Sequence, residues 1–205
     1  FMRGRTDNDY IIGNQDSYLS EWQAAGLDRL ATEVIECTHE PSSAAQTAIR
    51  CVTRHAAPGS EHAIRCTTIY TFDNEGCFRV TNEVDTAAMP VTTLPRVGMR
   101  CGLAAGLERL SWYGRGPHES YPDRKQSALV GLYCATVDEQ FFPFVDPCEC
   151  GGHTDTRWVE LADAQGCGVR ITGLPTLHVS ALHYGMEDLM CAGHVYELPR
   201  TKEVH

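Results

Sequence analysis

The chain has 205 residues, of which 42% are hydrophobic, and its formal net charge at pH 7 is -10. This length suffices to bury a hydrophobic core, and we expect one domain over residues 1–205. A net negative charge without a block of lysine and arginine argues against a nucleic-acid partner, and no apolar run approaches the ~20 residues of a membrane span.

The N-terminal stretch places three side chains with oxygen donors, Asp7, Asn8 and Asp9, shortly before Gly13 and Asn14. Glycine and asparagine adopt left-handed backbone angles readily, so a loop is expected at Gly13 and Asn14. Three donors are too few for a hard cation, and the EF-hand pattern is absent. Turn or cap chemistry is therefore the preferred interpretation of the three residues, with cation binding as the alternative.

A short helix is predicted next, beginning after a cap at Asp16 or Ser17 and ending before Gly26. Either cap residue can accept a hydrogen bond from the first helical turn. Leu19 and Trp22 are three positions apart and share one face, which can dock on a sheet. Glycine is typical of the position just after a helix.

Residues 32–85 alternate between inward-facing and outward-facing side chains, which predicts half-buried antiparallel strands. Turn signals at residues 57–60 and 73–76 separate neighbouring strands. We expect a meander, followed by a crossing to another sheet at residues 90–95. The residues expected to share faces in the last two strands are Ile64, Cys66, Thr68, Tyr70 and Phe72, and Phe78, Val80, Asn82 and Val84.

The second half of the chain continues this pattern. A turn is predicted at residues 163–166 and a brief helix at residues 186–190. Phe141, Phe142 and Phe144 would be costly in water, so we expect them to cover a sheet edge or to dock another domain. Strands are predicted at residues 97–104, 107–112, 127–136, 158–161, 168–172 and 177–184.

Ten cysteines are scattered along the chain, mostly one to each predicted strand, without the paired spacing of a disulfide-stapled scaffold. We interpret them as buried thiols that act as small hydrophobic groups, with structural disulfides as the alternative. Free thiols favour a reducing compartment, so the predicted location is cytoplasmic.

One group of side chains, Cys148, Cys150, His153 and Asp155, resembles a metal site. Zinc prefers two residues between paired cysteines and needs a fourth ligand, whereas here a single residue separates them and the next histidine is distant. A glycine-rich loop with incidental thiols is the preferred interpretation, and no metal ligand is assigned.

The most specified stretch is residues 112–124, Trp-Tyr-Gly-Arg-Gly-Pro-His-Glu-Ser-Tyr-Pro-Asp-Arg. Its glycines give backbone freedom, its prolines fix φ, and charges of both signs lie among three aromatic rings. We predict a structural corner in which Arg124 pairs with Glu119 or Asp123, with direct substrate contact as the alternative. The residues assigned to this corner are Trp112, Gly114, Gly116, Pro117, Glu119, Tyr121, Pro122, Asp123 and Arg124.

This stretch resembles the signature Trp-x-Gly-x-Gly-Pro-x-Glu-x-Tyr-Pro-Asp-Arg of the C-terminal, small-chain domain of family 2 β-galactosidases. Four further segments resemble family motifs in the same order: residues 1–9, 94–98, 144–151 and 156–158. They match Phe-x-Arg-Ala-Pro-x-Asp-Asn-Asp, Pro-Arg-x-Gly, Tyr-Val-x-Pro-x-Glu-Asn-Gly and Arg-Trp. The chain departs from these motifs with Gly4-Arg5 where Ala-Pro is expected and with Cys150 where a side-chain amide is expected.

The resemblance implies an all-β antiparallel supersandwich, galactose mutarotase-like, with one or two short helices. It also implies that the chain is part of a larger β-galactosidase, which hydrolyses terminal β-D-galactosides with retention in carbohydrate metabolism. In this family both catalytic glutamates lie on a separate barrel domain, so no catalytic residue is assigned and the isolated chain is not expected to be catalytic. Its expected role is to complete the active-site pocket and the assembly.

The implied partners are the catalytic barrel domain or large chain, the galactoside substrate, and further copies in a homo-oligomer. No cofactor is expected in this chain, and the resemblance implies magnesium and sodium ions in the barrel of the parent enzyme. Family members also carry a loop at the mouth of the sugar pocket. The resemblance therefore places Asp7, Asn8, Asp9, Gly13 and Asn14 near substrate.

Two alternatives remain open from the sequence. An aldose mutarotase needs a histidine acid facing a glutamate base, for which the candidates are His118 with Glu119, or His183 with Glu149. A carbohydrate-binding or assembly module would instead stack sugar on aromatic rings, and the candidates are Trp112, Tyr121 and Trp158.

Overall fold

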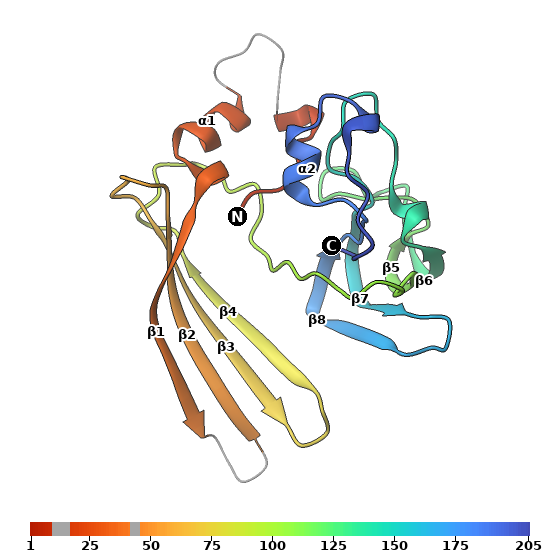
Figure 1. Cartoon of the computed structure of the whole chain (residues 1–205), viewed down its shortest axis with the longest axis horizontal. Coiled ribbons are helices and arrows are strands. Elements are labelled where there is room, and N and C mark those ends of the chain that lie inside the picture. The colour runs from red at the N-terminus through yellow and green to blue at the C-terminus, as the bar shows by residue number, and fades with distance from the viewer. Residues whose placement is uncertain (10–16, 42–45) are drawn as a thin grey trace. The chain divides into compact units, whose positions relative to one another are not determined.

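The computed structural model describes residues 1–9, 17–41 and 46–205. The chain divides into two compact units, which we call the N-terminal unit (residues 1–2 and 8–97) and the C-terminal unit (residues 3–7 and 98–205). Each unit contains one four-stranded antiparallel sheet (Figure 1). The expectation of one domain over residues 1–205 stays a prediction.

The sheet of the N-terminal unit is the predicted meander. Its strands β1 (Ala31–Pro41), β2 (Gln46–Ala56), β3 (Ile64–Asp73) and β4 (Phe78–Asp85) pair in chain order (Figure 1). The predicted faces are confirmed by the register, in which Cys66 lies opposite Val84 and Phe72 opposite Phe78. The turn at residues 73–76 closes because the Asp73 carboxylate accepts hydrogen bonds from two later backbone N–H groups and Gly76 adopts a φ of 83°.

The predicted helix is also present, as α1 (Tyr18–Ala24). Ser17 is its N-cap, and the Ser17 hydroxyl accepts a hydrogen bond of 3.3 Å from the backbone N–H of Ser20. Trp22 is buried and donates its indole N–H to the carbonyl of Thr93 at 3.1 Å. The short 3-10 segments η1 (Asp7–Asp9) and η2 (Leu27–Arg29) flank this region of the chain.

The C-terminal unit carries the second sheet, in the order β6-β5-β7-β8. A buried cluster on this sheet includes Leu110, Trp112, Val159 and Leu161. Val204, near the C-terminus, joins that cluster. The elements of this unit are β5 (Arg109–Gly116), β6 (Leu129–Thr136), η3 (Asp138–Gln140), β7 (His153–Ala162), β8 (Gly168–Val179), α2 (Met186–Cys191) and η4 (Val195–Glu197).

Three expectations about the second half of the chain need correction. Residues 97–104 form no strand apart from a single bridge from Leu103 to Val204. Apolar side chains alternate in this segment, but Val97, Met99 and Cys101 are exposed, and the glycines at 98 and 102 weaken a strand. The strand predicted at 168–172 runs on to Val179 as β8. Phe141 and Phe144 pack on the unit's own cluster of Cys150, Leu182 and Leu189, whereas Phe142 is exposed.

The fold class itself is confirmed. Two antiparallel sheets and two short α-helices make the chain all-β, as the alternating pattern predicted. Among the described residues, none of the helices combines the length and apolar character that crossing a bilayer requires.

The cap of α1 can be tested by changing Ser17 to alanine, which removes the acceptor of the Ser20 N–H. We expect this change to destabilise the helix by about 1 kcal/mol, whereas Ser17→Asp should keep the cap. Amide hydrogen exchange over residues 18–24 measures the difference. Equal exchange rates in the alanine variant and the unchanged chain would contradict the assigned cap.

Candidate functional site

The corner predicted at residues 112–124 starts within β5, which ends at Gly116. The Gly116-Pro117 peptide bond is cis, and the chain then turns back toward β6. Tyr121 and Arg124 exchange backbone hydrogen bonds of 3.1 and 2.9 Å, so residues 121–124 form a closed turn with Pro122 at its second position. Local backbone pairing therefore defines this part of the corner.

Glu119 fastens this corner to a distant part of the chain. Its carboxylate accepts a hydrogen bond from the Arg124 guanidinium and another, of 2.9 Å, from the backbone N–H of Gly151. Of the two predicted partners of Arg124, the structure thus selects Glu119, and this hydrogen bond raises the pKa of Arg124. The guanidinium also lies 5.7 Å from the centre of the Tyr121 ring. These contacts are structural and leave little of the carboxylate free for chemistry.

Ser120 makes a second connection between the same segments. Its backbone N–H donates to the carbonyl of Gly152 at 2.7 Å. Its buried hydroxyl lies 3.0 Å from the backbone N–H of Thr154 and 2.9 Å from the Thr154 hydroxyl. Because all of these groups are buried, each needs such a partner, and the connection is correspondingly specific.

Trp112 and His153 form the buried side of the corner. The Trp112 indole N–H and the Nδ1 atom of His153 both lie within hydrogen-bonding distance of the Arg115 carbonyl, at 2.9 and 3.1 Å. The two rings pack with centres 4.1 Å apart, and Nε2 of His153 lies 2.7 Å from the Gln140 side-chain oxygen. Burial lowers the pKa of His153 to about 4, so the ring is neutral at pH 7.

Arg115, Lys125 and Asp155 form an ion cluster beside the corner. Asp155 accepts hydrogen bonds from the Arg115 Nε atom at 2.5 Å and from the Lys125 amine at 3.2 Å. Arg115 also donates to the backbone carbonyls of Lys125 and Ala128, at 3.0 and 2.8 Å. The hydrogen bond from Arg115 is the main cause that lowers the pKa of Asp155. Asp155 holds a left-handed backbone angle, φ 52°, which few non-glycine residues adopt.

A pocket of about 200 Å³ opens next to this ion cluster. Asp155 is the sole carboxylate among its lining residues, and its charge is balanced by Lys125. Retaining glycoside hydrolysis needs two carboxyl groups about 5 Å apart, so this pocket lacks the groups for that reaction. The lining residues are Pro122, Lys125, Thr154, Asp155, Thr176, Leu177 and His178.

Cys148 and Cys150 do not form a zinc site with their neighbours. Burial raises the pKa of Cys148 to about 11 and that of Cys150 to about 12, so both thiols stay protonated and are poor metal ligands. Both ring nitrogens of His153 face groups of the protein, the Arg115 carbonyl and the Gln140 side chain, and not a metal site. Within residues 1–9, 17–41 and 46–205, no group of three or more His, Cys, Asp or Glu side chains is arranged to hold a metal ion.

The residues predicted near substrate are only partly described. Asp7, Asn8 and Asp9 form η1, with Asp9 buried and the other two exposed. Gly13 and Asn14 lie outside the described residues. The role of all five at a sugar pocket stays a prediction.

Gly4 and Arg5, which stand where the family motif has Ala-Pro, contact Glu149, and Glu149 is buried. The Glu149 carboxylate accepts a 3.0 Å hydrogen bond from the Gly4 N–H, and the Glu149 N–H donates to the Arg5 carbonyl at 3.0 Å. A Cβ atom at position 4 would lie 3.1 Å from the Glu149 nitrogen, so glycine suits this close approach. The segment of residues 3–7 is thereby anchored to the C-terminal unit.

In the structure, the histidines and glutamates considered for a mutarotase contact other groups. His183 is buried and lies 2.8 Å from the Glu108 carboxylate, while Glu149 binds Gly4. His118 is 3.1 Å from the Ser127 hydroxyl, and Glu119 binds Arg124 and Gly151. Glu108 was not singled out from the sequence, because nothing in its local pattern marks a partner 75 positions away.

The structure also bears on the three aromatic residues considered for stacking on sugar. Trp112 is only 1% exposed, so the expectation that it stacks on sugar is wrong for the described fold. Trp158 is covered on one face by the Arg170 guanidinium, 4.0 Å from its ring centre. Burial, followed by the negative charges of Glu149 and Glu119, raises the pKa of the Tyr121 hydroxyl. Tyr121 also meets the His178 ring edge-on at 5.3 Å between ring centres.

Comparison with known proteins gives consistent matches. The family model described as beta galactosidase small chain matches residues 1–205. The chain is 35% identical over 206 residues to a beta-galactosidase of Priestia megaterium, an alignment covering 100% of this chain and 19% of that protein. It is 36% identical over 169 residues to a beta-galactosidase of Vibrio cholerae, covering 78% of this chain and 16% of that protein.

A third relative, a beta-galactosidase of Arthrobacter sp., is 31% identical over 222 residues, which cover 98% of this chain and 21% of the relative. The chain therefore spans about a fifth of the length of the curated relatives it matches.

The close approach of β5 and β7 is testable at Gly114. An added Cβ atom there would lie 2.8 Å from the Thr156 Cα atom, a backbone contact that cannot move aside easily. We expect Gly114→Ala to destabilise the C-terminal unit by about 1–3 kcal/mol in urea unfolding. Gly102→Ala is the control, because nothing lies within 4 Å of a Cβ atom at that position. Similar losses in both variants would contradict this interpretation.

A second test concerns the buried ring of His153. In the unfolded chain the ring binds a proton below about pH 6.5, but in the folded chain only near pH 4. Its contribution to stability is complete above pH 6.5 and is lost as the pH falls toward 4. The stability difference between the unchanged chain and His153→Gln should therefore shrink over this range, by up to about 3 kcal/mol.

Urea unfolding at a series of pH values between 7 and 4 measures this difference. Gly102→Ala, an exposed change that removes no titratable group, serves as the control, and its effect on stability should be the same at every pH. A His153→Gln penalty that stays constant across the range would show that burial does not hold the ring neutral.

Proposed function

The chain belongs to the beta galactosidase small chain family, and from this membership we propose that it is the noncatalytic C-terminal portion of a β-galactosidase. In this proposal it completes the substrate pocket and the assembly of an enzyme whose catalytic carboxylates lie elsewhere. The observation that carries the proposal is the match of the family model over all 205 residues.

The geometry of the C-terminal unit supports a noncatalytic role. Its conspicuous acids are engaged internally: Glu119 by Arg124 and Gly151, Glu149 by Gly4, and Asp155 by Arg115 and Lys125. His153 is neutral and buried. A general acid and a nucleophile both need access to substrate, and none of these groups has the required freedom.

The remaining parts of the proposal concern the parent enzyme. We propose that it cleaves terminal β-D-galactosides with retention, in the cytoplasm, as a homo-oligomer, and that its barrel domain or large chain is the partner of this chain. The expectation that the ten cysteines are buried is wrong, since only Cys66 and Cys150 are buried, but all ten are free thiols, which supports a reducing compartment. Magnesium and sodium ions are assigned to the barrel of the parent enzyme, and no step proposed for this chain depends on them. The residues proposed to border the sugar pocket are Asp7, Asn8, Asp9, Gly13 and Asn14.

The proposal predicts that this chain hydrolyses nitrophenyl β-galactoside only after mixing with a large fragment of a related β-galactosidase. The chain alone and the large fragment alone are the controls. Gly102→Ala should complement as well as the unchanged chain, whereas Gly114→Ala should complement less, because it disturbs the corner.

Polarimetry of galactose in the same samples tests the mutarotase alternative. Interconversion of α- and β-galactose by this chain alone, abolished by His118→Gln or His183→Gln, would overturn the noncatalytic assignment. Failure of every mixture to hydrolyse the galactoside, although the chain is folded, would count against the role in completing the enzyme.

A further inference from the structure

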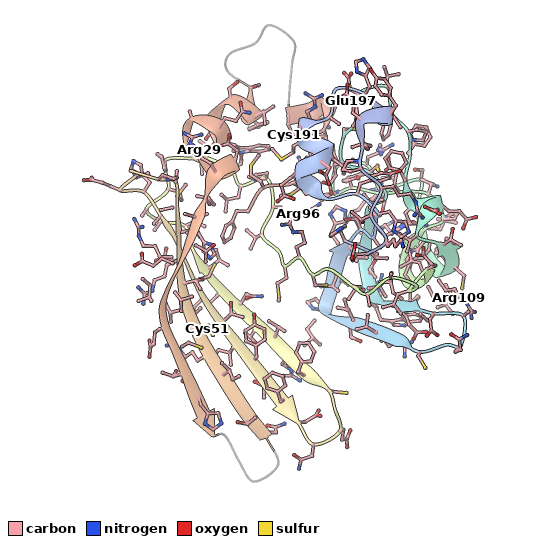
Figure 2. All side chains as sticks on the ribbon, in the orientation of Figure 1. Arg29, Cys51, Arg96, Arg109, Cys191 and Glu197 are labelled. Carbon is pink, nitrogen blue, oxygen red and sulfur yellow. The ribbon has the colours of Figure 1, made fainter. Side chains whose placement is uncertain are left out.

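Two cysteines of the N-terminal unit face one another across neighbouring strands. Cys37 on β1 lies directly opposite Cys51 on β2, and their Sγ atoms are 3.0 Å apart. Figure 2 marks Cys51 on the second strand of this sheet. Directly opposite residues of an antiparallel pair have Cα atoms about 4.5–5.5 Å apart, which lies within the range that a disulfide spans. The two sulfurs therefore need to approach by only about 1 Å, without a shift of register.

This arrangement is specific to one pair. In the pairings of the described strands, Cys66 lies opposite Thr53 and Val84, and Cys134 lies opposite Ser111. The remaining cysteines fall outside the eight described strands. The strand register thus brings Cys37 and Cys51 together, although their spacing along the sequence does not indicate it.

The two sulfurs differ in their exposure to solvent. Cys37 is exposed, whereas Cys51 is partly covered. The contact between the two sulfurs is a hydrogen bond in which one thiol donates to the other. This hydrogen bond, followed by burial, raises the pKa of Cys51. Because Cys37 is the more exposed of the two, it is the sulfur that meets a reagent from solution first.

We propose that Cys37 and Cys51 form a reversible cross-strand disulfide by exchange with a low-molecular-weight disulfide such as glutathione disulfide. The Cys37 thiolate attacks one sulfur of the reagent, which forms a mixed disulfide and expels one thiolate. Cys51 then loses its proton and attacks the Cys37 sulfur, which expels the second thiolate. The two protein thiols are oxidised by two electrons, and one reagent disulfide is reduced to two thiols.

The consequence is a covalent fastening of β1 to β2. β1 is an edge strand of its sheet, since it pairs with β2 alone in the order β1-β2-β3-β4. An edge strand can separate without breaking a second ladder, so a link to its neighbour restrains the part of the sheet that opens most readily. This site is independent of the proposed role in a β-galactosidase.

The test uses the full chain, reduced and then exposed to glutathione disulfide, quenched with an alkylating reagent and analysed as peptides by mass spectrometry. We expect the peptides of Cys37 and Cys51 to be linked, with two hydrogens lost and no glutathione retained, and to separate on treatment with dithiothreitol. Cys51→Ser should leave glutathione on Cys37. Cys77→Ser is the matched control, because Cys77 is exposed but lies outside the strand pairings.

Three results would overturn the proposal. One is glutathione that stays on Cys37 in the unchanged chain as fully as in Cys51→Ser, and another is the absence of reaction at both cysteines. The third is linkage of Cys37 to other cysteines of the folded chain as often as to Cys51. A parallel reaction in denaturant should lose the preference for the pair, because the strand register creates it. If a serine variant folds poorly, the peptides of the unchanged chain still show whether Cys37 and Cys51 become linked.

Discussion

The C-terminal unit depends on satisfying the buried backbone groups where β5 ends and the chain turns at Pro117. The Arg115 carbonyl lies within hydrogen-bonding distance of both Trp112 and His153, the Gly151 N–H donates to Glu119, and the Gly152 carbonyl accepts from Ser120. An unpaired backbone group in such a position costs ~1–3 kcal/mol, so each of these side chains supports the corner. The sheet strands on either side are held in place through this set of hydrogen bonds.

The charged side chains of this region serve mainly to hold the corner together. Glu119 and Asp155 lie in a region with several potential acids and bases, yet both bind cations or backbone N–H groups within the unit. A histidine held neutral by burial cannot cycle a proton near pH 7 without a large free-energy cost. The residues of the corner thus hold one another and the neighbouring backbone in place.

In the N-terminal unit, the sheet is set by the alternation of inward-facing and outward-facing side chains and by the residues of the turns. Asp73 closes one turn and Ser17 caps α1, so local hydrogen bonds set the ends of the elements. Strand register then brings together side chains that are distant in sequence. Cys37 and Cys51 are the clearest case, since 14 positions separate them along the chain while 3.0 Å separates their sulfurs.

The sequence by itself determined the all-β class, the meander, the two helices and the presence of a corner at residues 112–124. These features depend on periodicity, caps and turn residues, which act over a few positions. The sequence offered Glu119 or Asp123 as the partner of Arg124, and the tertiary structure shows the ion pair with Glu119. Tertiary structure alone decided that His183 meets Glu108. It also decided that Asp155 gathers Arg115 and Lys125, and that Trp112 is buried. Such partners lie on separate segments, and burial depends on the whole packing of a unit, so local pattern carries no record of either.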